Sequence, residues 1–320
     1  MHEIPPALRA GPFSRETARS NGVTARMLQG KRFVRVLSGV WRFRDHPMTD
    51  ADWVRAARLA LPADVHVTGI TRIQALGLDH GPRLPVRFVV ERDLHLAHDE
   101  VFLHRTKRLP PTDDVGVTPA AAYIFYCAHA RVIDAAKVGD WLLHRGHLTI
   151  DEVRALALAE LWRPGAHEAI WMLDHLDGRA RSLKESETRM ILDFAGVPTP
   201  ELNAQVGLAD DAIAFGDLVY RQCRLVVEHE GAQHQDDRRQ YVSDIDRYAL
   251  FRAHDVAYVQ VTREKLERPR TVVGEVFRAL LSRGSAGPVP EFRERWGLLF
   301  LPVSGAVAPQ GRVIDRASGA

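Results

Sequence analysis

The stretch GDLVYRQCRLVVEHEGAQHQ, residues 216–235, places acidic side chains in the most β-prone hydrophobic part of the chain. Asp217 lies within an apolar run, Glu228 follows directly after Leu-Val-Val, and Glu230 comes two residues later. Removing an acid from water is costly in free energy unless a partner compensates the charge. These acids therefore indicate either ion pairs or a bound cation.

The same stretch predicts a β-hairpin. Three strands are expected, over residues 204–208, 213–220 and 224–230. Side chains alternate along a strand, so Glu228 and Glu230 are expected on one face and His229 on the other. A hairpin that closes at Gln222 brings Asp217 close to Glu228 or to its neighbour.

A helix is expected before these strands, within SLKESETRMILDFAG, residues 182–196. Ser182 is its predicted N-cap, and Glu185 completes a capping box three residues later. Glu187 shares one helical face with apolar residues, namely Leu183, Met190 and Phe194. An acid that faces the core needs a partner or a metal, so Glu187 is expected to join the acids of the hairpin.

From residue 182 to residue 283 the expected order is helix, three strands, helix, strand, helix (αβββαβα). Its acids suit a divalent cation, because Mg²⁺ prefers hard oxygen ligands and usually takes one or two protein carboxylates. Such an ion can activate water and neutralise charge on a phosphodiester. The alternative is a hairpin whose surface carboxylates pair with arginines, namely Arg221, Arg224 and Arg247.

Residues 182–280 resemble the very-short-patch-repair-like endonuclease domains of the PD-(D/E)XK superfamily. The resemblance rests on SETRMILDFAGVPTPELN, GDLVYRQCRLVVEHEGAQH and YVSDIDRYALF. It implies a restriction-endonuclease-like fold and phosphodiester hydrolysis that depends on Mg²⁺, with Mn²⁺ as an alternative ion. It also implies that Asp217 is the central metal ligand and Glu228 the second acid. The backbone carbonyl of His229 would also contact the metal, and Glu187 would orient a metal-bound water.

The chain departs from this superfamily at one position. Glu230 stands where the superfamily usually has a lysine, and a glutamate cannot stabilise negative charge on the nucleophile or phosphate. In the repair-type branch a nearby histidine assists instead, which makes His234 the candidate general acid or base. Gln233 is a candidate for positioning water or phosphate.

The N-terminal sequence FSRETARSNGVTARMLQGKRFVRVLSGVWRF, residues 13–43, predicts two short helices followed by a two-stranded wing. Ser14 and Thr24 are the expected helix caps. The strands are expected over residues 33–36 and 40–43. This order of elements is that of a winged helix-turn-helix.

The N-terminal sequence is similar to the winged-helix domain of the abortive-infection type IV antitoxins, over about 45 residues. That resemblance implies DNA binding and autoregulation. Residues 1–47 carry nine Lys/Arg against three Asp/Glu, whereas residues 180–283 carry fifteen against seventeen. A basic head of this kind fits a polyanion. The candidate phosphate contacts are Arg26, Lys31, Arg32, Arg35 and Arg42. The alternative is a small helical cap with a solvated basic face.

The middle region is a mixture of predicted helices and strands without assigned chemistry. Helices are expected over residues 52–61 and 66–77, strands over 85–93 and 100–109, and helices again from 118 to about 177. The resulting domains are a winged helix (1–47), a linking domain (48–178), an endonuclease-like domain (179–283) and a Gly/Ala/Pro-rich tail (284–320). The tail is expected either to dock on the body or to be largely disordered. The overall class is α/β, or α+β when the domains are taken together.

Composition limits the remaining possibilities. Hydrophobic residues make up 46% of the chain and charged residues 26%, as in ordinary globular proteins. No apolar run approaches the ~20 residues that span a bilayer, and no signal peptide is recognisable. Two cysteines are too few for a disulfide framework. A cytoplasmic protein is the expectation.

Together these patterns predict a metal-dependent DNA endonuclease guided by a winged-helix domain. DNA is the expected partner, with a toxin-like partner or a second copy of the chain as further candidates. A non-catalytic, antitoxin-like transcriptional regulator is the alternative. An RNA nuclease or toxin would use the same metal chemistry.

Overall fold

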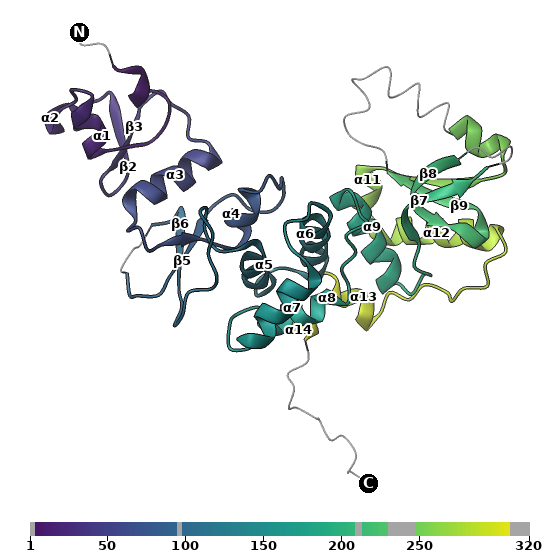
Figure 1. The fold of residues 1–320 in the computed structure, drawn as a ribbon. Helices are drawn as coiled ribbons and strands as arrows, with labels where there is room; N and C mark the ends of the chain where they lie inside the picture. Colours follow the sequence, from purple (N-terminus) through teal and green to yellow (C-terminus); the bar gives the residue numbers. More distant parts are fainter. Residues whose placement is uncertain (1–3, 95–97, 209–212, 230–247, 308–320) are drawn as a thin grey trace. The chain divides into compact units, whose positions relative to one another are not determined.

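The computed structural model describes residues 4–94, 98–208, 213–229 and 248–307. The described residues form helices and three β-sheets (Figure 1), which confirms the mixed α+β class. The chain divides into two compact units, residues 1–122 and 123–320. In these four ranges, no helix combines the length and the apolar character needed to cross a membrane.

The first unit begins with short helices and a small sheet. In chain order these are η1 (Pro6–Leu8), β1 (Phe13–Ser14), α1 (Arg15–Ser20), α2 (Ala25–Leu28), β2 (Phe33–Leu37) and β3 (Val40–Phe43). The strands form an antiparallel sheet in the order β1-β3-β2. Ser14 accepts the N–H of Thr17 at 3.1 Å and Thr24 that of Met27 at 3.3 Å, so both predicted caps are confirmed.

A second sheet completes this unit. Its elements are α3 (Asp50–Ala60), β4 (His66–Val67), α4 (Gly69–Gln74), β5 (Val86–Val90) and β6 (Val101–Arg105). The helix expected over residues 66–77 starts later than predicted, because residues 66–67 are extended and pair with β5. This pairing places Val67 in the core, where its side chain is buried. β5 and β6 are parallel.

One hydrophobic cluster crosses the domain boundary predicted after residue 47. Leu37 and Val40 of the N-terminal sheet pack in it with Ala57 of α3 and Phe88 of β5. A separate cluster fills the space between η1, α1, α2 and the N-terminal sheet. The head and the second sheet therefore share core residues, and a finer division within this unit stays a prediction.

Helices dominate the start of the second unit, as predicted for residues 118–177. They are α5 (Pro119–Cys127), which begins just before the unit boundary, α6 (Val132–His144), α7 (Ile150–Ala159) and α8 (Ala166–Leu173). The described part of the tail contains α13 (Glu294–Leu298) and α14 (Val303–Ala306). It docks on this helical region through two backbone hydrogen bonds. The N–H of Val132 donates to the carbonyl of Leu301 at 3.0 Å, and the N–H of Val303 donates to the carbonyl of Ala130 at 2.9 Å.

The C-terminal part of this unit is built on a four-stranded sheet with the order β10-β9-β8-β7. Its elements are α9 (Leu183–Phe194), β7 (Glu201–Gly207), β8 (Ile213–Tyr220), η3 (Arg221–Cys223), β9 (Leu225–His229), a helix over 248–253, β10 (Ala257–Val261), α11 (Arg263–Leu266) and α12 (Pro269–Ser282). Within this four-stranded sheet, β9 and β10 pair in parallel, and the described pairs β7–β8 and β8–β9 are antiparallel. α9 packs on β8, and α12 packs on β9, β10 and α9 (Figure 1). Apart from the short α11, the described elements follow the predicted order.

The turn between β8 and β9 sets the register of the hairpin. It contains η3 and then Arg224, whose φ of 46° is left-handed. The guanidinium of Arg224 donates to the carbonyl of His254 at 2.7 Å, which holds the turn against the chain before β10. The resulting register pairs Leu218 with Val227.

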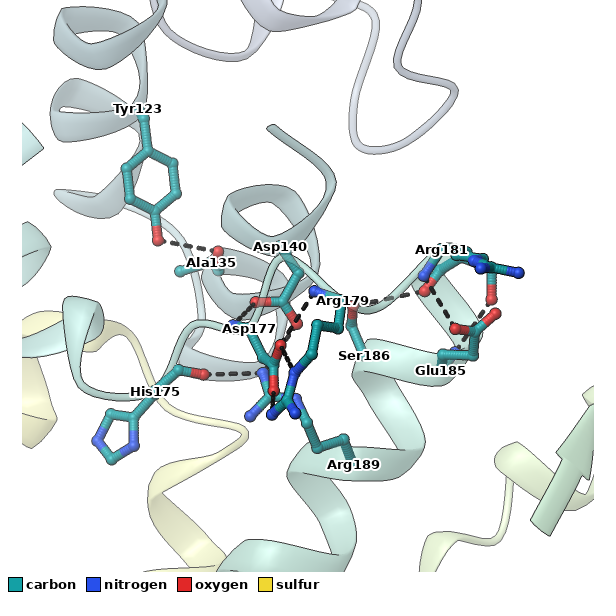
Figure 2. A network of polar contacts seen from close by, with 11 residues as sticks. Tyr123, Ala135, Asp140, His175, Asp177, Arg179, Arg181, Glu185, Ser186 and Arg189 are labelled. Carbon is teal, nitrogen blue, oxygen red and sulfur yellow. Dashed lines mark hydrogen bonds and ion pairs between the residues drawn. The ribbon is translucent and has the colours of Figure 1, made fainter. Parts of the chain in front are cut away.

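A buried ion pair joins α6 to α9 (Figure 2). The Nη2 of Arg189 donates to Oδ2 of Asp140 and to the carbonyl of His175, both at 2.8 Å. The other oxygen of Asp140 accepts the N–H of Asp177 at 2.6 Å. The Asp140 side chain is 0% exposed, and this burial raises its pKa although Arg189 opposes the shift. The boundary predicted between residues 178 and 179 thus lies inside a shared polar network.

Candidate functional site

Among the described residues, the pairing of β8 with β9 ends immediately before their acidic residues. The last paired positions are Leu218 and Val227, and Asp217 and Glu228 are the next residue on each strand. From there β8 continues to pair with β7, and β9 continues to pair with β10. We call this place the fork, defined by Asp217, Glu228 and His229. Two acids from neighbouring strands thus stand where the shared ladder ends.

Asp217 is held at the fork by His229. Its Oδ2 accepts the backbone N–H of His229 at 2.9 Å and lies 3.3 Å from the Nδ1 of the same residue. A carboxylate oxygen therefore receives an N–H that a strand carbonyl would accept in a continued ladder. The Asp217 side chain is 26% exposed. The hairpin was predicted to bring Asp217 to Glu228 or its neighbour, and the contact with His229 confirms the latter.

Glu228 is a buried acid. It is 1% exposed, lies in register with Gln260 of β10, and follows two fully buried residues, Val226 and Val227. A carboxylate at this depth must be compensated by hydrogen bonds, a cation or protonation. Glu228 follows the last paired residue of β9 as Asp217 precedes that of β8, and both side chains carry hard oxygen atoms.

Asn203 of β7 stands opposite Asp217 in a left-handed backbone conformation. It lies between the paired positions Leu202–Leu218 and Ala204–Gly216, with a left-handed φ of 47°. Asparagine tolerates this conformation better than most residues. Asn203 was not among the predicted site residues and lies just before the strand predicted over residues 204–208, whereas β7 already begins at Glu201.

The side chain of Asn203 is anchored by Glu185 of α9. Its Nδ2 donates to Oε2 of Glu185 at 2.6 Å. The same glutamate oxygen accepts the backbone N–H of Arg181 at 2.9 Å, not that of Ser182 as a capping box requires. Ser182 itself accepts the N–H of Glu185 at 3.2 Å, so the predicted N-cap is confirmed and the reciprocal bond is shifted by one residue.

Glu187 pairs with a lysine of α6. The Nζ of Lys137 lies 2.7 Å from its Oε2, and the Glu187 side chain is 25% exposed. The partner expected for this inward-facing acid is thus Lys137. The neighbour of Glu187 on α9, Thr188, contacts the fork, and its Oγ1 lies 2.7 Å from the Nε2 of His229. A role for Glu187 toward a metal-bound water stays a prediction.

The remaining predicted residues of this site are Glu230, Gln233 and His234, and they lie outside the described residues. Within the described part of the chain, no group of three or more His, Cys, Asp or Glu side chains is arranged to hold a metal ion. Among the described residues, the predicted oxygen ligands for a metal ion are therefore Asp217, Glu228 and the backbone carbonyl of His229.

The predicted nucleic-acid contacts of the head fall into two groups. Arg26 on α2 and Lys31 in the following turn are exposed, and Arg32 is half-buried. These side chains surround the connection from α2 to the wing. Exposed basic groups at such a position suit contacts to phosphate.

The two arginines on the wing have partners within the head. Arg35 donates from Nη2 to Oγ of Ser38 in the wing turn at 3.2 Å. Arg42 donates from Nη1 to the carbonyl of His46 at 2.7 Å, after the wing. Both side chains support the local backbone, and a further role toward nucleic acid stays a prediction.

Comparisons of the chain with protein-family models, curated proteins and solved structures found no match.

Proposed function

We propose that this protein is a DNA endonuclease that requires Mg²⁺, or alternatively Mn²⁺, and that its basic head binds DNA. The observation that carries the proposal is the fork, where acids of two adjacent strands stand at the end of their shared ladder. The order of the described elements supports a PD-(D/E)XK-like fold. The order of helices and strands in the head supports a winged helix.

The donors at the fork fit the proposed ion. Asp217, Glu228 and the backbone carbonyl of His229 offer hard oxygen atoms, and two carboxylates match the usual number for Mg²⁺. When bound, the ion activates water and neutralises charge on the phosphodiester. The protein supplies a carboxylate that accepts the backbone N–H of His229 and contacts its Nδ1, and a second carboxylate that is shielded from bulk water.

The proposal is tested by incubating the full-length protein with duplex DNA, single-stranded DNA and RNA, with Mg²⁺, Mn²⁺ or EDTA. We expect DNA strand scission with either ion and none with EDTA. Cleavage of RNA alone would assign the same chemistry to another substrate. Absence of cleavage under every condition would contradict the proposal.

A non-catalytic DNA-binding regulator is the second candidate function. It is favoured by Glu230, which stands at the position of the expected lysine, and by the exposed basic residues of the head. Calorimetry with Mn²⁺ and gel shifts with the promoter DNA of its own gene distinguish the two. A DNA complex without detectable ion binding would favour the regulator.

Arg26→Ala and Lys31→Ala are expected to weaken DNA binding uniformly across sequences. Each phosphate contact that is lost should lower the salt-dependence slope of log K by about 0.9, or about 2 for the double variant. Fluorescence anisotropy at several salt concentrations measures this slope. Lys107→Ala is the matched control, because Lys107 is an exposed lysine outside the head. An unchanged slope in the double variant would exclude these residues from the interface.

A further inference from the structure

The imidazole of His229 bridges two other side chains of the second unit. Its Nδ1 lies 3.3 Å from Oδ2 of Asp217 on β8, and its Nε2 lies 2.7 Å from Oγ1 of Thr188 on α9. The His229 side chain is 5% exposed, and Thr188 is 0% exposed. Both ring nitrogens of His229 thus link α9 to β8 through contacts that are buried at Thr188 and His229 and partly exposed at Asp217.

We propose that His229 and Thr188 are positioning residues that fix the Asp217 carboxylate for a divalent cation. This inference rests on the proposed function, and it concerns the side chain of His229 in addition to its carbonyl. Neither side chain would touch the ion. Their effect would pass through Asp217, as partners of metal-binding carboxylates do in other proteins.

The contacts assign the proton positions on the ring. An ionised carboxylate can only accept hydrogen bonds, so the Nδ1 of His229 carries a proton toward Asp217. In the neutral ring Nε2 is then an acceptor, and the hydroxyl of Thr188 donates to it. The hydroxyl of Thr188 can donate or accept, and by donating to Nε2 it stabilises the tautomer that Asp217 needs.

The two bonds from His229 restrict the rotation of the carboxylate. The backbone N–H and the Nδ1–H meet the same oxygen of Asp217, at 2.9 and 3.3 Å, from different directions. Removing the imidazole leaves only the backbone bond of this pair, so His229 then constrains the orientation of the carboxylate less. A ligand that must be reoriented on each binding event binds its ion more weakly.

The first test reads the tautomer directly in the metal-free protein. We expect ¹⁵N-histidine NMR spectra above neutral pH to show the Nδ1–H form of His229, assigned by its loss in His229→Asn. Thr188→Val removes the donor to Nε2 and should give a mixture of tautomers, whereas Thr188→Ser should keep the Nδ1–H form. An Nε2–H form in the wild-type protein would overturn the inference.

The second test measures Mn²⁺ affinity by calorimetry on the full chain. We expect about 10–100-fold weaker binding for His229→Ala, a smaller loss for Thr188→Val, and wild-type affinity for Thr188→Ser. His175→Ala is the matched control, because it removes a half-buried imidazole elsewhere in the same unit. The ring of His175 contacts those of Trp171 and Phe194. Thermal unfolding verifies that each variant is folded, and Thr188→Val carries the test if His229→Ala does not fold.

The outcomes separate this inference from the proposed function. Wild-type protein that binds no Mn²⁺ would contradict both. Wild-type protein that binds Mn²⁺, with unchanged affinity in His229→Ala and Thr188→Val, would contradict only the positioning role.

Discussion

Asp217→Asn and Glu228→Gln are each expected to lower the rate of Mg²⁺-dependent DNA cleavage by about 10³-fold or more. Each change keeps the shape of the side chain and removes one negative charge from the fork. Charge stabilisation by a bound ion contributes several kcal/mol to such reactions, and ~1.4 kcal/mol corresponds to a factor of ten in rate. Single-turnover cleavage of labelled DNA measures the effect.

The same substitution at an acid away from the fork provides the control. Glu201→Gln on β7 removes an acid whose side chain is 47% exposed and paired with Arg221, so we expect the cleavage rate of the wild-type protein. DNA binding should persist in all three variants, because the basic residues of the head are intact. Undiminished cleavage by both fork variants would refute the assignment of the site.

Arg189→Met is expected to destabilise the second unit by about 3–5 kcal/mol, because it leaves the carboxylate of Asp140 buried without its cation. Urea unfolding followed by circular dichroism measures the loss. The double variant Asp140→Leu with Arg189→Met should recover part of the stability, since no unpaired charge then remains buried.

A surface ion pair in the same unit gives the comparison. Arg154 pairs with Asp151 on α7, where the Asp151 side chain is 94% exposed. Arg154→Met should therefore change the free energy of unfolding by about 0.5 kcal/mol or less. An effect of that small size for Arg189→Met would show that the buried pair does not hold α6 and α9 together.

Local features of the fold were predictable from the sequence. Ser14, Thr24 and Ser182 each cap a helix as expected, because a cap depends on residues only three positions apart. The hairpin of β8 and β9 was predictable for a similar reason, since two apolar runs flank a short polar turn. Contacts between distant elements were not predictable from the sequence. The pairing of residues 66–67 with β5 and the ion pair between Asp140 and Arg189 are two examples.

The candidate site also combines features that were predictable from local sequence with contacts between distant elements that were not. The contact of Asp217 with the residue after Glu228 follows from strand register. Thr188 and Asn203 carry no pattern that marks them, because their roles arise only where α9 and β7 meet the hairpin. The inward orientation of Glu187 was predicted from helical spacing, but its partner Lys137 lies 50 residues earlier in the chain.

The left-handed turn at Arg224 has a consequence for how the hairpin tolerates sequence change. Side chains alternate along β9, so inserting or deleting a single residue among 221–224 shifts its register by one and turns both Glu228 and His229 to the opposite face of the sheet. Such a change barely alters the hydrophobic composition of the strands. The number of residues in this turn, more than their identity, therefore determines whether the two acids stand together.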